Sequence, residues 1–158
     1  MADTVSPAVR SRMMSGIRGK NTEPELTIRR GLHAMGFRFL LYPKKLPGKP
    51  DLALPKWKTA IFVNGCFWHG HNCDLFKWPK TRPDFWKKKI TGNRERDAEN
   101  ILALEDIGWR VLTIWECAIR GKNRESLDRV LLRTGSWIRG RGKKLEIGST
   151  GGRKNGKA

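Results

Sequence analysis

The sequence predicts an α/β fold in which a central mixed β-sheet is flanked by helices. Residues 57–63 form a near-continuous apolar stretch, which suits a strand covered on both faces, and residues 109–115 alternate and are rich in branched side chains, as in a central strand. Segments with apolar residues at helical spacing lie around them. The order is helix, strand, strand, strand, helix, strand, helix, which is typical of an α/β sheet. A chain of 158 residues suits about one domain of roughly 150 residues.

The first helix is predicted to begin at Thr22 and to stop at Gly36. Thr22 and Glu25, three positions apart, form a capping box, and Pro24 suits the first turn. Residues 37–42 then favour a strand, which a turn-rich loop separates from a short strand at residues 51–54.

The second half of the chain alternates helices with one strand. A basic aromatic segment, residues 76–89, precedes a polar helix at about 93–106, which Gly108 ends. The strand at 109–115 follows, and the last helix spans about 124–138.

We expect three parts along the chain. Residues 1–21 form an N-terminal basic arm, residues 22–138 form the folded domain, and residues 139–158 form a flexible basic tail outside the core. The arm is either an amphipathic helix or a disordered segment. Its apolar residues at helical spacing are Val9, Met13, Met14 and Ile17.

The charge of the chain predicts a polyanionic partner. It carries 33 Lys and Arg against 15 Asp and Glu, a formal net charge of +18. Such a field attracts nucleic acid phosphates, although a solvated surface or adsorption to an anionic membrane would have the same composition. No apolar run approaches the roughly 20 residues that span a bilayer, and the N-terminus lacks the apolar core of a signal peptide. We therefore expect an intracellular protein without a membrane partner.

Residues 65–73, G-C-F-W-H-G-H-N-C, predict a metal site. Cys66, His71 and Cys73 lie within eight residues, and Cys117 ends a strand that we place beside them. Zinc prefers this mixture of sulfur and nitrogen in a tetrahedral structural site. Two alternatives stay open. The cysteines could be small buried apolar residues beside a solvated His71, or His69 could replace His71 as the fourth ligand.

Pro50 and Asp51, at the start of a strand with another strand about ten residues on, are also found in metal-dependent nucleases. Phosphodiester hydrolysis needs a carboxylate for Mg²⁺, a base for water and a proton donor for the leaving oxygen. In most chains the same dipeptide is only a turn.

Five motifs in a fixed order carry a family resemblance. They are L-P-G-K-P-D at 46–51, G-C-F-W-H-G-H-N-C at 65–73, T-R-P-D-F-W at 81–86, N-R-E-R-D at 93–97 and G-W-R-V-L-T-I-W-E-C-A-I-R-G at 108–121. From Met13 to about Ile138 the chain resembles the very short patch repair (Vsr) endonucleases. These are mismatch nickases on a variant of the PD-(D/E)xK restriction-endonuclease fold.

The resemblance implies catalytic roles for four residues. Asp51 would bind Mg²⁺, His69 would be the general base and Asp97 would orient His69. Without the resemblance, Asp97 is a solvated helix charge. Glu25 would help to organise the water shell of the metal, while the capping box explains the same residue by local hydrogen bonds.

Two departures from the superfamily pattern affect the metal and the leaving group. Val63 and Gly65 stand where related enzymes have a second acid and a lysine, so Mg²⁺ would rely on Asp51, the backbone carbonyl of Val63 and phosphate oxygens. Another member of the family has a histidine at position 64 with a supporting role at the leaving group. Asn64 supplies no proton at neutral pH, so we expect departure of the leaving group to be slower or more dependent on the metal.

DNA recognition is also implied by the resemblance. Phe67, Trp68 and Trp86 resemble the aromatic wedge that enters the duplex beside a T:G pair, although seven tryptophans in this chain must mostly be core. In the arm, Met14 and Ile17 would enter the minor groove. The cations expected on the DNA backbone are Arg10, Arg12, Arg18, Lys49, Arg82, Lys87 and Lys88.

The implied function is a zinc-stabilised, Mg²⁺-dependent endonuclease that nicks 5′ of the thymine in T:G mismatches left by deamination of 5-methylcytosine. This cut would start very short patch repair. The enzyme would be a monomer in the prokaryotic cytoplasm, close to the nucleoid, with mismatch-repair proteins as further partners. Two rivals stay open: a non-catalytic zinc-containing DNA-binding module, and a restriction-type nuclease on paired sites.

Overall fold

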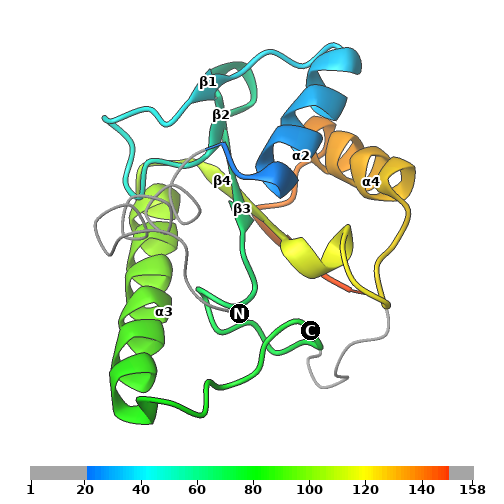
Figure 1. The fold of residues 1–158 in the computed structure, drawn as a ribbon. Helices are drawn as coiled ribbons and strands as arrows, with labels where there is room; N and C mark the ends of the chain where they lie inside the picture. Colours follow the sequence, from blue (N-terminus) through cyan, green and yellow to red (C-terminus); the bar gives the residue numbers. More distant parts are fainter. Residues whose placement is uncertain (1–20, 150–158) are drawn as a thin grey trace.

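The computed structural model describes residues 21–149, which form a five-stranded mixed sheet (Figure 1). The strand order follows the sequence, and the first strand pairs antiparallel with the second, as the second does with the third. The third, fourth and fifth strands are parallel. The predicted α/β class with a mixed sheet is therefore confirmed. The strands are β1 (Leu40–Leu41), β2 (Leu52–Leu54), β3 (Thr59–Asn64), β4 (Arg110–Trp115) and β5 (Lys144–Ile147).

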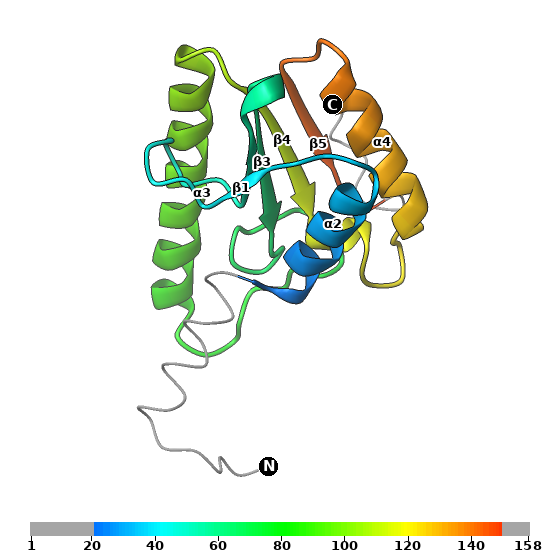
Figure 2. The same ribbon diagram turned by 90° about the horizontal axis from the view of Figure 1, so that it is seen from above.

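Helices cover both faces of the sheet. On one face α2 (Glu23–Ala34) and α4 (Leu127–Arg139) lie together, and on the other lies the long α3 (Pro83–Asp106) (Figure 2). None of these described helices has the length and apolar character that crossing a membrane requires.

The two central strands bury side chains on both faces. Ile61 and Leu112 belong to the larger core under α2 and α4, while Ala60 and Val111 pack with Leu104 of α3. Double burial explains why β3 and β4 are near-continuous apolar runs in the sequence.

The helix predicted from Thr22 to Gly36 is present. Thr22 Oγ1 accepts a hydrogen bond from the backbone N–H of Glu25, at 3.4 Å, and Pro24 lies in the first turn. Gly36 follows the helix with a φ of +98°, a conformation that glycine adopts without steric cost.

The strand predicted at residues 37–42 and the helix predicted at 93–106 have different bounds in the structure. The strand shrinks to the two residues of β1. The helix α3 begins ten residues earlier, at Pro83, and its buried residues are Ile90 and Leu104. A helix with so few buried positions shows little apolar periodicity, so the sequence pattern concealed its first turns.

The prediction that residues 139–158 form a tail outside the core was wrong for β5. This strand pairs in parallel with β4 along its whole length, and Ile147 is 1% exposed. Only Leu145 and Ile147 are apolar among neighbouring Lys and Gly residues, which is too few to signal a strand. The folded domain thus continues beyond residue 138. The arm up to residue 20 and the tail from residue 150 lie outside the described residues.

Candidate active site

One edge of the sheet gathers the predicted site residues. The parallel strands β3, β4 and β5 all end at this edge, and β2 begins there because it is antiparallel to β3. Asp51 immediately precedes β2, and the loop at 65–73 immediately follows β3. Cys117 follows β4. Strand ends of this kind are common places for ligand sites in α/β proteins.

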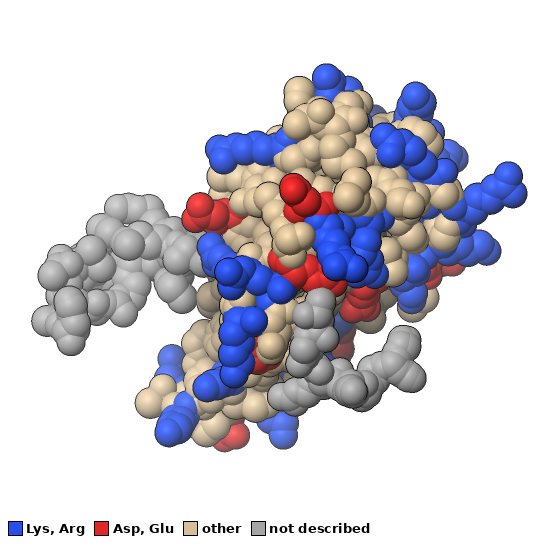
Figure 3. Space-filling model, turned by 90° about the vertical axis from the view of Figure 1, so that its right-hand side faces the viewer, with Lys and Arg blue, Asp and Glu red and all other residues tan. Residues whose placement is uncertain are grey.

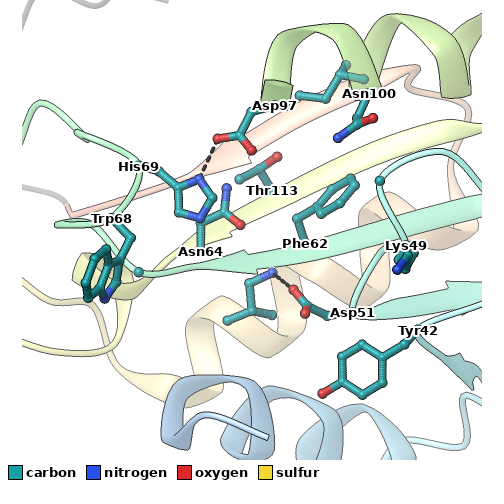
Figure 4. A pocket seen from close by; sticks show the side chains of 14 residues that line it. Tyr42, Lys49, Asp51, Phe62, Asn64, Trp68, His69, Asp97, Asn100 and Thr113 are labelled. Atoms are coloured by element: carbon teal, nitrogen blue, oxygen red, sulfur yellow. Dashed lines mark hydrogen bonds and ion pairs between the residues drawn. The ribbon is translucent and has the colours of Figure 1, made fainter. Parts of the chain in front are cut away.

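A cleft of about 340 Å³ lies at this edge, and four of the residues with predicted catalytic roles line it (Figure 4). Asp51 comes from the start of β2, Asn64 from the end of β3, His69 from the loop and Asp97 from α3. Segments far apart in the sequence therefore contribute a carboxylate and an imidazole to one cavity.

Asp51 is held by the neighbouring strand. Its Oδ2 accepts a hydrogen bond from the backbone N–H of Val63, at 2.7 Å. The net effect of its surroundings raises the pKa of Asp51 to about 7: burial is the largest cause and the charge of Glu25 adds to it, while the Val63 N–H and Arg29 act in the opposite direction. An ionised Asp51 is thus costly in this cleft unless a cation is near.

His69 and Asp97 form a hydrogen-bonded pair. Nδ1 of His69 lies 2.5 Å from Oδ2 of Asp97, and the two side chains are 25% and 33% exposed. Because a carboxylate only accepts, Nδ1 carries the proton and Nε2 is left for the cleft (Figure 4). The predicted contact between these residues is present, while their catalytic roles stay predictions.

The loop that carries His69 is fastened to α3. Asn93 donates a hydrogen bond from Nδ2 to the carbonyl of Trp68, at 2.8 Å. Gly70 has a φ of +59°, and a Cβ at this position would lie 2.7 Å from Ile90. Only glycine allows this backbone to approach α3 so closely.

Glu25 is buried beside the cleft and has three donors. Its Oε2 accepts hydrogen bonds from Arg29 Nη1, at 2.9 Å, and from the hydroxyl of Tyr42, and its Oε1 accepts one from the backbone N–H of Asn21, at 3.1 Å. The capping box is thus only half formed, because its second bond would come from the N–H of Thr22. Sequence reasoning missed Arg29 and Tyr42; the i, i+4 spacing of Glu25 and Arg29 was the available signal.

The predicted zinc ligands are brought together. One ligand atom from each of Cys66, His71, Cys73 and Cys117 lies within 4.8 Å of all the others. Nδ1 of His71 is 3.6 Å from Sγ of Cys66 and 3.4 Å from Sγ of Cys117. Tetrahedral zinc holds such atoms roughly 3.5–3.8 Å apart, so the set fits this metal. His69 faces Asp97 and is not part of the cluster.

The surroundings of the cluster favour a thiolate on Cys117. Hydrogen bonds from Cys66, the largest cause, and from His71 and Ser149 together lower the pKa of Cys117 to about 4, although burial acts in the opposite direction. The hydrogen bond between Cys66 and Cys117, with burial, raises the pKa of Cys66. The N–H of Ser149 lies 3.2 Å from Sγ of Cys117, and the ring of His71 stacks on Trp115 at 4.0 Å. Sequence reasoning missed Ser149 because it lies in the supposed tail.

The three predicted wedge residues pack against one another. The ring centroid of Phe67 is 5.2 Å from Trp68 and 5.3 Å from Trp86. Phe76 and Phe85 extend this aromatic group, which the sequence prediction did not include. All three wedge residues are partly exposed.

The residues predicted to bind phosphate lie in different surroundings. Lys49 lines the cleft, and the guanidinium of Arg82 lies 4.3 Å from the ring centroid of Phe85. Lys87 and Lys88 are exposed on α3. Figure 3 shows lysine and arginine side chains spread over the face that it draws, with a smaller group of acidic ones near the middle. The remaining candidates lie outside the described residues: Arg10, Arg12, Met14, Ile17 and Arg18.

Known proteins resemble the chain over most of its length. Residues 2–75 match the family model described as DNA mismatch endonuclease Vsr. The Type II nicking enzyme V.XorIIP of Xanthomonas oryzae pv. oryzae is 46% identical over 134 residues, which are 81% of this chain and 98% of that protein. The DNA mismatch endonuclease Vsr of Escherichia coli is 40% identical over 151 residues, 96% of this chain and 97% of that protein. The Type II nicking enzyme V.NmeAIP of Neisseria meningitidis is 44% identical over 133 residues, with 83% and 95% covered.

These identities extend over nearly the full length of the relatives, and they accompany a mixed sheet with the site at its strand ends. The chain therefore belongs to the DNA mismatch endonuclease Vsr family, which has a restriction-endonuclease-like fold.

Proposed function

We propose that this protein is a strand-specific DNA endonuclease that nicks 5′ of the thymine in T:G mismatches and so starts very short patch repair. The observation that carries the proposal is the shared cleft of Asp51 and the His69–Asp97 pair. The relatives named as mismatch endonuclease and nicking enzymes support the reaction class.

His69 acts as the general base. With the proton on Nδ1 and Asp97 against it, Nε2 accepts a proton from water that attacks the phosphate. Asp97 keeps the ring in this tautomer and stabilises the imidazolium that forms.

Asp51 and the backbone carbonyl of Val63 hold Mg²⁺. Oxygen donors are the ligands that Mg²⁺ prefers, and the raised pKa of Asp51 marks a carboxylate that gains from a neighbouring cation. The ion supplies Lewis-acid stabilisation of charge on the phosphate oxygens. Asn64, in the wall of the same cleft, donates a hydrogen bond near the leaving oxygen but no proton.

The cluster of Cys66, His71, Cys73 and Cys117 holds zinc as a structural ion. Four protein ligands leave no open position, so this metal fixes the loop rather than acting on the substrate. The loop in turn carries the wedge residues Phe67 and Trp68, which with Trp86 enter the duplex where pairing is weak. A mismatched step costs less to unstack, and selectivity follows from that difference.

One experiment separates this function from its rivals. Two oligonucleotide duplexes that differ only in a T:G or T:A pair are incubated with the protein, with and without Mg²⁺, in several sequence contexts. We expect a nick 5′ of the thymine in the T:G duplex alone, and only with Mg²⁺. Equal cleavage of both duplexes would indicate a restriction-type nuclease, and binding without any cleavage would indicate a non-catalytic module.

A further inference from the structure

The Glu25 carboxylate is enclosed more completely than helix capping requires. The residue is only 1% exposed, although it lies in the first turn of α2. The cap itself uses the backbone N–H of Glu25 and Thr22 Oγ1, and it does not involve the carboxylate. A buried charge of this kind persists only where other groups compensate for its desolvation.

The compensation comes from two side chains and one backbone amide. Arg29 donates from Nη1 to Oε2 and from Nη2 to Oδ1 of Asn21, at 2.9 and 2.8 Å. The Tyr42 hydroxyl donates to the same Oε2 and accepts from the N–H of Asn21, at 2.9 Å. Among the described residues, Oε2 of Glu25 thus accepts two hydrogen bonds and Oε1 accepts one, so Oε1 retains capacity for another donor such as water.

Tyr42 connects this network to the cleft. It lines the cleft together with Asp51, and Figure 4 shows its ring between Asp51 and α2, with the hydroxyl directed towards the helix. Its φ of +49° is an unusual backbone conformation for an aromatic residue. Such conformations persist where the surrounding structure enforces them, and they concentrate at functional sites.

Glu25 and Asp51 are close enough to affect each other. The charge of Glu25 contributes to the raised pKa of Asp51, and Arg29 opposes it. Two carboxylates at the side of one cleft, one of them with an acceptor position that no residue of the range 21–149 fills, suit a hydrated divalent cation.

We propose that Tyr42 is a positioning residue for the nicking reaction. Its hydroxyl, with Arg29, fixes the Glu25 carboxylate beside Asp51, where Oε1 accepts a hydrogen bond from water of the cation's shell. This role rests on the proposed endonuclease function. The same hydroxyl also fixes the amide of Asn21, so the start of the described chain is tied to the wall of the cleft.

The first test is Tyr42→Phe, which removes one hydroxyl and keeps the ring. We expect single-turnover nicking at saturating T:G duplex to fall by about tenfold or more, the usual cost of a hydrogen bond to a charged group. Duplex affinity stays within about twofold of wild type, since no group that touches DNA is lost. The Mg²⁺ concentration for half-maximal nicking rises.

Thr134→Val is the matched control. Thr134 is fully buried in α4, and its hydroxyl donates to the carbonyl of Val130, at 2.8 Å, far from the cleft in sequence and fold. The Thr134→Val variant loses one hydrogen-bonded hydroxyl, as Tyr42→Phe does, and we expect it to lower the melting temperature while the nicking rate stays that of wild type. Wild-type nicking by Tyr42→Phe, or a loss shared equally by Thr134→Val, would overturn the proposal.

A second measurement does not depend on nicking. Tyr42 is the single tyrosine of the chain, so protein with ¹³C-labelled tyrosine gives one set of ring signals by NMR. We expect Mg²⁺ to shift these signals in the wild type and to leave them unchanged in Asp51→Asn. If the protein nicks no duplex, the proposed function fails while this shift still tests the positioning. Ring signals that do not respond to Mg²⁺ would contradict it.

Discussion

The cysteine–histidine cluster and the cleft share one loop, residues 65–73, yet the cluster is closed and the cleft is open to solvent. In the cluster, four ligand atoms lie within 4.8 Å of one another, and all three cysteines are buried. In the cleft, His69 and Asp97 are 25% and 33% exposed around an open cavity. Closed metal sites stabilise structure, whereas open ones leave room for a substrate.

In the same way, two histidines two positions apart make different contacts. His71 turns to the sulfur atoms and stacks on Trp115, while His69 turns to Asp97. Gly70 between them permits the turn, at a φ of +59°. The cluster thereby holds in place the loop that carries His69, the proposed base.

Removal of zinc is the strongest test of the comparison. We expect purified protein to contain one zinc ion per chain, and a strong chelator or Cys117→Ser to lower the melting temperature by on the order of 10 °C. Nicking falls with it, because the loop that carries His69 loses its anchor. Added Zn²⁺ restores the melting temperature and the nicking rate of the chelated protein, but not those of the Cys117→Ser variant. If the metal-free protein keeps the melting temperature of the wild type, the cluster has no structural role.

His69→Ala sharpens the comparison from the side of the cleft. Loss of a general base lowers the single-turnover nicking rate by roughly 10²- to 10⁴-fold. The zinc content and melting temperature stay near wild type, since His69 is not in the cluster. His33→Ala, at an exposed position of α2, is the control and keeps full activity. If His69→Ala loses zinc instead, the assignment of the two histidines is reversed.

Asp97→Asn has a smaller effect on the same pair. An amide holds the imidazole less firmly in the required tautomer, so the nicking rate falls by about tenfold to 100-fold while duplex binding is retained. Glu95→Gln, an exposed neighbour on α3, changes the charge equally and leaves the rate unchanged. Equal losses in both variants would mean that Asp97 is only a surface charge.

We also expect a small gain in the stability of the folded protein when the charge of Asp51 is removed. Folding raises the pKa of Asp51 from 3.8 to about 7, so the folded state binds this proton more tightly than the unfolded state. The stabilisation that accompanies the proton is complete at low pH and is lost as pH rises through about 7. Metal-free Asp51→Asn therefore melts a few degrees above wild type at about pH 8, and the gain shrinks at about pH 5. A calorimetric gain that is equal at both pH values would contradict the raised pKa.

The sequence predicted what depends on short spacing and strong composition. Cys66, His71 and Cys73 fall within eight residues, and the parallel pairing of β3 with β4 brings Cys117 beside them. The mixed sheet followed from two apolar runs long enough to be central strands.

Contacts made only by tertiary packing were not predictable in this way. Tyr42 was expected in a strand, and its hydroxyl meets Glu25 only because β1 ends beside the start of α2. Ser149 and β5 carry too little apolar character to be separated from a basic tail. The turns of α3 near Pro83 were concealed because they bury few side chains.

In the proposed reaction, Asp51 and His69 act on one phosphate from one cleft. The most direct test is single-turnover nicking of one T:G duplex by wild type and by Asp51→Asn with Mg²⁺, with duplex affinity measured in parallel. We expect equal binding and no detectable nick by the variant. A variant that binds the duplex and nicks it at the wild-type rate would contradict the account.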